Sequence, residues 1–255
     1  MRAVALGRGC AGIFLFSTLW QVSEASGFVH YAYLPAPTAI ARGLITLVVS
    51  GKAFLATVHT LRATLIGWSI ASIVGVSSGV LLGTSSFLRR YSLTTIEVLR
   101  PLPAVALVPI GLLLFGFSIK TELFVIFIPT IWPVLVNTMA GIQAVPFRLR
   151  EVGHCLRLNR LHAVTKILIP AAAPAILVGL RLGLSIALIL SIITEMIGIP
   201  HGLGYAIVME AQALRPNLMF AYVFIIGILG ILLNASLISV AKIMLPGEFC
   251  RPRSP

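Results

Sequence analysis

The 255 residues of this chain are 58% hydrophobic and only 10% charged, and their mean hydropathy is +1.05. This composition leaves too little polar surface to cover a water-soluble globule, so we expect an exterior that faces lipid. The formal net charge of +12 does not indicate nucleic-acid binding, because the cations flank apolar runs instead of clustering on one soluble face. Aspartate is absent and only seven glutamates are present, which leaves few candidates for a carboxylate dyad.

Six apolar runs are candidates for membrane spans, each of which needs about 20 largely apolar residues. Five lie near residues 59–83, 102–119, 123–142, 171–197 and 218–241. A shorter run, residues 9–22, follows Arg2 and Arg8 and is either a retained first helix or a cleaved secretory signal. The retained helix is favoured because it completes the charge topology. We therefore predict an all-α membrane protein with about six transmembrane helices in one domain, residues 1–255.

The positive charges are divided unevenly between the predicted loops. With the N-terminus inside, the cytoplasmic segments hold 13 of the 19 Lys and Arg residues, the outer segments hold five, and Arg181 lies within a span. Because cytoplasmic loops carry an excess of Lys and Arg, we expect both termini in the cytoplasm. Cys10, Cys155 and Cys250 fall on the same side and form no CxxC pattern, which predicts reduced, unpaired thiols.

The second span carries small residues at a strict period of four, which places them on one stripe of a helix. They are Gly67, Ala71, Gly75, Gly79 and Gly83. Such a stripe lets helix backbones approach closely, which is how helices associate in lipid. We expect this helix to be buried or to face another subunit, and the alternative is chance in a chain with 22 glycines.

Prolines mark the next two spans. Pro101, Pro103 and Pro109 open the third span, and the fourth contains Pro129 and Pro133. Each proline removes a backbone donor, so we expect kinked or broken helices. Irregular backbone within a membrane must be covered by protein or line a wet cavity, which makes these spans candidates for the translocation path. Harmless kinks and span ends are the alternative.

The longest inner loop, residues 144–170, has a pattern of its own. Pro146 suits a first helical turn, and Leu149, Val152 and Leu156 then form one apolar face. Asn159 is a candidate N-cap for a second short helix. The apolar face of that helix consists of Leu161, Val164 and Leu168, before Pro170. Two short amphipathic helices form either a docking knob or a pair of helices lying on anionic lipid.

The run EVGHCLRLNRLHAVTKILIPAAAPAILVGLRLGLSIALILSIITEMIG, residues 151–198, resembles the signature loop and following helix of permeases of binding-protein-dependent ABC importers. LRPLPAVALVPIGLLLFG from residue 99, NTMAGIQAVP from residue 137 and GLGYAI from residue 202 extend the similarity. The combined order is most similar to the nitrate, sulfonate and taurine importer branch. Three positions depart from the family pattern. Val152 and Gly153 replace two alanines, and Arg157 replaces a turn glycine, so we expect Asn159 or Asn-like left-handed geometry nearby to supply the turn instead.

The resemblance implies the type I permease fold in a bacterial inner membrane, and alternating access by two such subunits, with an identical second copy favoured. The partners implied are an extracytoplasmic solute-binding protein and an ATP-binding subunit. This chain has no GxxxxGK[ST] phosphate loop, so it is expected to be non-catalytic. The cargo implied is a small anion such as a sulfonate, taurine or nitrate; a passive channel or membrane scaffold is the rival interpretation. Residues 144–170 then form a coupling loop to the ATPase, through Glu151, Gly153, Arg157, Asn159, Arg160, Leu161, Val164 and Pro170.

Arg181 and Glu195 place charge inside the fifth span, where each group costs at least about 2.5 kcal/mol unless it faces protein or water. They lie 14 residues apart, about 21 Å along a helix, so they cannot pair directly but share nearly the same face. One hypothesis is that Arg181 favours anionic cargo and that Glu195 holds an outer gate or a binding-protein contact. The alternative is structural pairing with neighbouring helices.

The five histidines include no HExxH motif, and His154 and His162 are eight positions apart. Solvated or interfacial histidine is therefore favoured over metal ligation. The sequence implies neither a metal site nor a cofactor.

Overall fold

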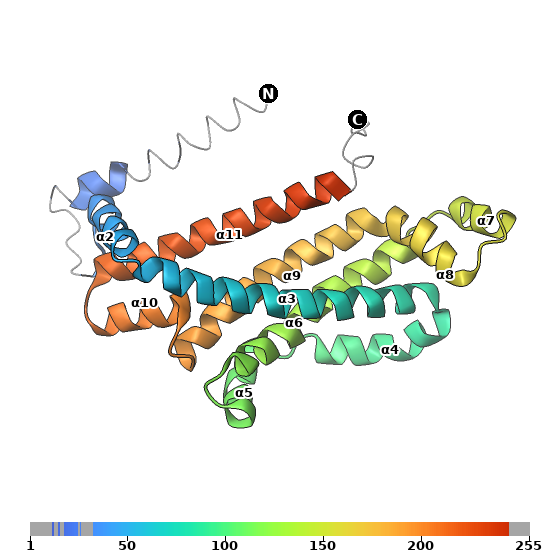
Figure 1. The fold of residues 1–255 in the computed structure, drawn as a ribbon, viewed down its shortest axis with the longest axis horizontal. Coiled ribbons are helices and arrows are strands. Elements are labelled where there is room, and N and C mark those ends of the chain that lie inside the picture. The colour runs from blue at the N-terminus through green and yellow to red at the C-terminus, as the bar shows by residue number, and fades with distance from the viewer. Residues whose placement is uncertain (1–11, 13–14, 16–17, 25, 27–32, 245–255) are drawn as a thin grey trace.

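The computed structural model describes residues 12, 15, 18–24, 26 and 33–244, and its regular structure is entirely helical in this part of the chain (Figure 1). This confirms the all-α prediction. The predicted span at residues 9–22 falls largely outside the described residues. In chain order the elements are α2 (Pro37–Val49), α3 (Lys52–Thr84), α4 (Ser86–Leu99), a 3₁₀ turn (Ala104–Ala106), α5 (Leu107–Phe115), α6 (Ile119–Gln143), α7 (Phe147–Cys155), α8 (Arg160–Ala163), a π-helical turn (Val164–Leu168), α9 (Ile169–Ile197), α10 (Gly202–Gln212) and α11 (Pro216–Met244).

Four of the described helices are long and apolar enough to cross a membrane: α3, α6, the continuous helix Arg160–Ile197 that contains α8 and α9, and α11. They run along the long axis of the molecule (Figure 1). A fifth span results if α4 and α5, which are bent by 79° at a short break, are counted together.

The predicted span at residues 102–119 differs from the others because it is not one straight helix. Pro101 and Pro103 lack backbone donors, so the helical hydrogen bonds cannot continue past Arg100, which is still in helical geometry, and α4 ends at Leu99. Helix α5 then has only nine residues, about 14 Å in length, which is too short to cross a bilayer alone. The break expected from these prolines is present.

Helix α6 does not break, although it contains Pro129 and Pro133. The side-chain amide of Asn137 donates to the Pro133 carbonyl oxygen at 2.8 Å, one turn further along the helix. Helix α9 also covers this region, since the Cβ of a residue in place of Gly179 would lie 2.9 Å from the same oxygen. Side-chain and interhelical packing therefore cover the irregular part of α6.

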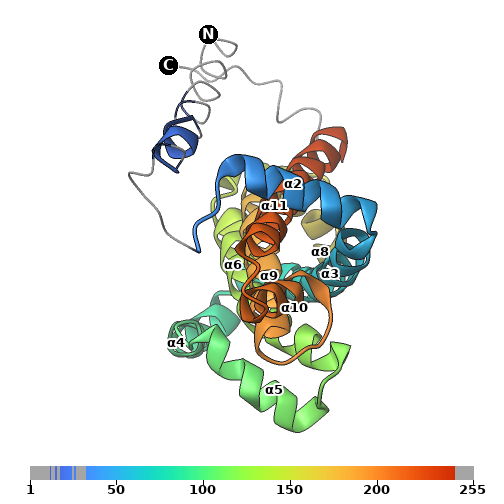
Figure 2. The same ribbon diagram turned by 90° about the vertical axis from the view of Figure 1, so that its left-hand side faces the viewer.

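Helices α3, α6 and α9 pack lengthwise to form the centre of the molecule (Figures 1 and 2). All five small residues of the α3 stripe are buried. A Cβ added at each of the four glycines of the stripe, taken in chain order, would contact Ile126, Val134, Thr138 and Ile142 of α6 in that same order. The two helices are therefore parallel. The stripe faces α6 of the same chain. Gly179 and Gly183 of α9 pack against α6 in the same way, with the opposite chain direction.

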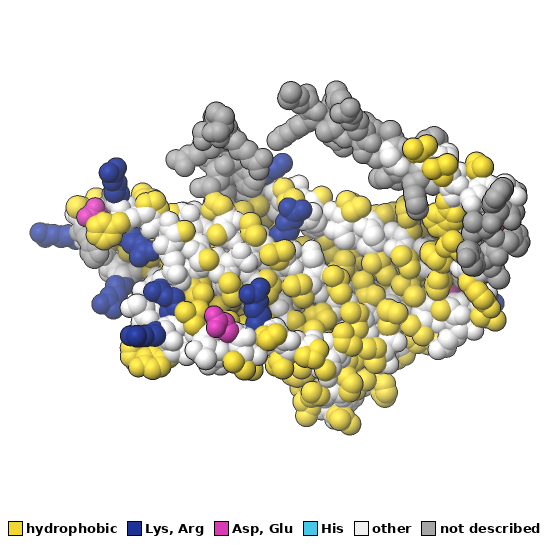
Figure 3. Space-filling model, turned by 180° about the vertical axis from the view of Figure 1, so that it is seen from behind, with side chains coloured by type: hydrophobic (Ala, Val, Ile, Leu, Met, Phe, Trp, Pro, Cys, Tyr) yellow, Lys and Arg dark blue, Asp and Glu magenta, His cyan; other side chains and the backbone are white. Residues whose placement is uncertain are grey.

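The two ends of the bundle differ in charge. The end that carries α7 and α8, here called the basic end, gathers Lys and Arg side chains, whereas the middle of the molecule is largely apolar (Figure 3). The opposite end, here called the α10 end, carries α2 and α10 (Figure 1). There Leu47, Leu203 and Tyr222 join the cores of α2, α10 and α11.

Candidate functional site

The coupling loop contains two helices joined by a sharp turn at the basic end. Helix α7 ends at Cys155, and the amide of Leu158 donates to the carbonyl oxygen of Gly153 at 3.0 Å. Arg157 has a φ of +49°, the left-handed conformation in which a side chain costs about 1 kcal/mol. Of the two alternatives expected for this turn, Asn159 does not supply it, because its backbone is extended; left-handed geometry nearby supplies it, at Arg157 itself.

Asn159 instead caps the second helix, as the sequence predicts. Its backbone is extended, with φ −68° and ψ 161°, and its side-chain oxygen accepts a hydrogen bond from the His162 amide at 2.8 Å. The same oxygen lies 2.7 Å from Nδ1 of the His162 ring. This pairing satisfies one of the free amides at the start of α8.

Helix α8 is not separated from the following span, although the sequence suggested a boundary at Pro170. The helical path runs without a break from Arg160 to Ile197 over 38 residues. Its second turn, Val164–Leu168, is π-helical. A wider turn is a common way for a helix to absorb a residue without a backbone donor, and Pro170 follows directly. The second half of the coupling loop is therefore the end of a membrane-crossing helix.

One side of the coupling loop is bonded to the end of α6 and packed against the chain, and the loop also carries exposed apolar side chains. Arg150 donates to the Ile142 carbonyl oxygen at 2.8 Å, which ties α7 to the end of α6. Gly153 is buried, and a Cβ there would lie 3.1 Å from the Ile167 side chain. The exposed apolar side chains are Phe147, Leu149, Leu156 and Leu161. Glu151 is exposed beside them, as is Arg160 of α8.

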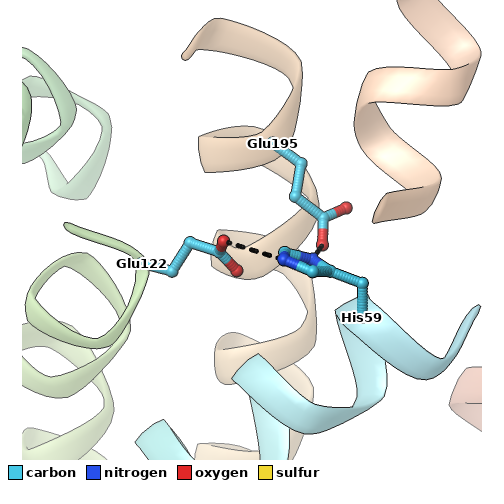
Figure 4. Close-up of side chains that lie close together, drawn as sticks. All are labelled: His59, Glu122 and Glu195. Carbon is cyan, nitrogen blue, oxygen red and sulfur yellow. Dashed lines mark ion pairs between the residues drawn. The ribbon is translucent and has the colours of Figure 1, made fainter. Parts of the chain in front are cut away.

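A second polar site lies at the α10 end, where α3, α6 and α9 converge (Figure 4). Glu195 of α9 is only 1% exposed, and its Oε2 accepts from the Thr60 hydroxyl at 3.0 Å and from the Gly204 amide at 2.8 Å. Thr60 in turn accepts from the Leu203 amide at 2.9 Å. These bonds correspond to the structural pairing considered for Glu195, and its gate role stays a prediction.

His59 of α3 lies between two carboxylates (Figure 4). Its Nδ1 is 3.6 Å from Oε1 of Glu195, and its Nε2 is 3.8 Å from Oε1 of Glu122 on α6. Glu122 is fully buried, whereas the His59 side chain is 28% exposed. The sequence did not predict this cluster, because its members come from three separate helices at no recognisable spacing. The signal available was a glutamate within a strongly apolar run.

Two glycines at the start of α10 allow its backbone to pack closely against Glu195. Gly202 begins α10 with a φ of +93°, and a Cβ at this position would overlap the Glu195 carboxyl group. Gly204 is buried beside it, where a Cβ would overlap the Ile192 carbonyl oxygen. Only glycine lets the α10 backbone approach Glu195 this closely.

Arg181 lies apart from this cluster, in the middle of α9. It is exposed on the surface of the chain and lines a cavity of about 350 Å³ between α9 and α11, together with Ser185 and Asn234. Glu195 faces the interior of the chain, so α9 does not present the two charges to one common space. Pro129 and Pro133 are half-buried in α6.

The chain matches a family described as the inner membrane component of binding-protein-dependent transport systems, over residues 71–247. The putative aliphatic sulfonates transport permease protein SsuC of Bacillus subtilis is 31% identical over 212 residues, 83% of this chain and 77% of that protein. The bicarbonate transport system permease protein CmpB of Synechocystis sp. is 32% identical over 250 residues, 93% and 88% of the two chains. The nitrate import permease protein NrtB of Leptolyngbya laminosa is 31% identical over 189 residues, 74% and 68%.

Solved structures show the same fold. The MetNI methionine ABC transporter in an inward-facing form has a TM-score of 0.65 at 16% identity, over 82% of this chain and 98% of that chain. An amino acid ABC transporter has a TM-score of 0.60 at 22% identity, over 80% and 97%. These likenesses confirm the type I importer permease fold. Together with the sequence relatives they show that this chain belongs to the permease family of binding-protein-dependent ABC importers.

Proposed function

We propose that this chain is the transmembrane subunit of an ATP-driven importer that moves a small anion across the cytoplasmic membrane by alternating access. The observation that carries the proposal is the continuous helix from Arg160 to Ile197. It begins in the coupling loop at the basic end and extends through the bundle to Glu195 at the α10 end. A displacement of α8 is thereby transmitted directly to a helix of the membrane core.

The coupling loop is the segment we propose to dock on a partner ATPase. Phe147 is 72% exposed, Leu156 is 65% exposed and Leu161 is 76% exposed. Apolar side chains at this exposure on a polar segment suit a protein groove. Glu151 and Arg160 lie beside them and supply charged contacts. Val164, the first residue of the π-helical turn after α8, is half-buried and is the apolar residue that follows Leu161 in the proposed contact.

The charge distribution supports the orientation of the subunit. The basic end follows the positive-inside rule if it lies in the cytoplasm, where ATP is available. The α10 end then faces outward, toward a solute-binding protein. A second copy of the chain completes the assembly, and the exposed apolar middle of the molecule supplies surface for that copy and for lipid (Figure 3).

Arg181 is the residue we propose to favour an anion. An exposed guanidinium in the middle of a membrane helix needs water, protein or cargo beside it. The SsuC, CmpB and NrtB relatives are named for sulfonates, bicarbonate and nitrate, all of which are anions. A side chain with five donors and a permanent positive charge suits each of these oxygen-rich groups.

Reconstitution tests the docking step. The chain is placed in nanodiscs with its ATPase and binding protein, and ATP hydrolysis is measured with sulfonate, bicarbonate or nitrate. We expect one of these anions to stimulate hydrolysis, and Leu161→Asp to abolish ATPase binding. Leu214→Asp, at an equally exposed leucine of the α10 end, should leave ATPase binding intact. Normal coupling in the Leu161 variant would overturn the docking assignment.

A second measurement tests the cargo role of Arg181. Arg181→Leu should lower anion uptake at least tenfold at normal expression, and Arg181→Lys should restore part of it because the charge is kept. Arg90→Leu removes an exposed arginine at the basic end and should leave uptake unchanged. Unchanged uptake in Arg181→Leu would show that the guanidinium does not select the cargo.

A further inference from the structure

The cluster at the α10 end contains polar atoms that the described part of the chain does not satisfy. Both carboxylate oxygens of Glu122 are buried and accept no hydrogen bond. Nδ1 of His59 is also buried and has no hydrogen-bond partner. Buried polar groups are nearly always hydrogen-bonded, and an unpaired buried carboxylate is among the most costly to leave so. Three such atoms in one place point to a group that binds there.

The arrangement of these atoms suits a metal ion. His59, Glu122 and Glu195 each offer a ligand atom, and the three atoms lie within 4.8 Å of one another. Imidazole nitrogen and carboxylate oxygen bind Zn²⁺ at about 2.0 to 2.2 Å, so two ligands of one ion lie about 3 to 3.6 Å apart. One ion takes only one nitrogen of His59, and that nitrogen lies close to this range from the carboxylate it faces: Nδ1 is 3.6 Å from Glu195, or Nε2 is 3.8 Å from Glu122. The remaining carboxylate, whose ligand atom lies within 4.8 Å, moves closer when the ion binds.

Charge and orientation support the same occupant. In the form that binds a metal, both carboxylates are ionised and the imidazole is neutral, so the three ligands carry a charge of −2, which a divalent cation neutralises. The Oε2 atom of Glu195 is held by Thr60 and by the Gly204 amide, which leaves Oε1 facing His59. Such outer contacts orient the ligands of metal sites. The His201 ring lies 5.5 Å from the His59 ring, centroid to centroid, and is exposed at the start of α10, in reach of a fourth position.

We propose that His59, Glu122 and Glu195 bind one divalent transition-metal ion, such as Zn²⁺, at the α10 end of each chain. The nitrogen ligand favours this class over Mg²⁺ and Ca²⁺, which take oxygen ligands. The ion joins α3, α6 and α9, the three central helices. This site is independent of cargo and of ATP. The absence of a sequence motif, which spoke against a metal, reflects only that the ligands come from distant segments.

The test measures metal binding to the purified chain in detergent, without ATPase or cargo, so that its failure is separate from any failure of the importer assignment. Cys155→Ser is used as the background, because Cys155 is an exposed free thiol. Zn²⁺ is titrated against a chromophoric chelator, and Co²⁺ is used to record the ligand-field spectrum. We expect one ion per chain.

Glu122→Gln and His59→Gln should each weaken Zn²⁺ binding at least tenfold and alter the Co²⁺ spectrum. Glu97→Gln and His162→Gln are the matched controls, because Glu97 lies exposed on α4 and His162 on α8. Both controls should bind as the background does. Equal binding by the Glu122 and His59 variants, or no binding at micromolar Zn²⁺ by the background chain, would overturn the proposal and leave His59 as a hydrogen-bonded link between two carboxyl groups.

Discussion

Gly79→Ala should loosen the contact between α3 and α6. The added Cβ would lie 2.6 Å from Cβ of Thr138 and 2.8 Å from the Leu135 carbonyl oxygen, and neither atom is the end of a flexible side chain. Ordinary contact begins at 3.4 Å, so the helices must separate locally by about 0.8 Å. Overpacking of this kind costs about 2 to 3 kcal/mol, and the helix propensity of alanine returns about 1 kcal/mol. We expect a net loss of about 1 to 2 kcal/mol.

The free energy of unfolding is measured by SDS titration of the detergent-solubilised chain, with tryptophan fluorescence as the probe, to which Trp20, Trp68 and Trp132 contribute. Trp68 suits this purpose because its Nε1 donates to the Leu180 carbonyl oxygen at 3.0 Å, between α3 and α9. Gly67→Ala should cost less, since its nearest contact is longer, 2.7 Å to Cγ2 of Ile126, and its three nearest atoms include no backbone oxygen. Gly227→Ala has open space and should be neutral or stabilising. If Gly79→Ala is as stable as Gly227→Ala, the packing argument is wrong.

Five further variants are read in the same titration. Arg157→Gly removes left-handed strain and should stabilise the chain by about 1 kcal/mol, as should Leu214→Gly, where φ is +54°. Asn159→Ala loses the cap of α8 and about 1 kcal/mol, whereas Asn159→Asp keeps an acceptor and should retain stability. Gly202→Ala should cost more than about 2 kcal/mol, because the new side chain overlaps the Glu195 carboxyl group; wild-type stability there would contradict the close approach.

Much of the bundle could be predicted from the sequence, because long apolar runs and a four-residue period are local properties. The period that begins at Gly67 placed one stripe on α3, and the structure shows the helix α6 that covers it. Asn159 was recognisable as a cap because it precedes its helix directly. The break after Leu99 followed from prolines two and four positions later.

What could not be predicted depends on which segments meet. The sequence gives no indication that Glu122 lies near His59, because α4 and α5 lie between their two helices in the chain. The continuity through Pro170 also escaped prediction, since a π turn has no simple residue pattern. The positive φ of Arg157 was not predicted as such, because arginine has no particular preference for the left-handed conformation.

The regular spacing on α3 has a geometric consequence for the whole bundle. A stripe that repeats every four residues fits its neighbour nearly as well after a shift of one repeat, about 6 Å along the axis. Shape alone therefore sets how close α3 lies but not which level it occupies. The hydrogen bond from Thr60 to Glu195 selects the level, because Glu195 is the only carboxylate on α9 and a shifted alignment supplies no other. Directional hydrogen bonding therefore fixes the axial position of α3, which the small-residue stripe alone would leave free to shift by one repeat.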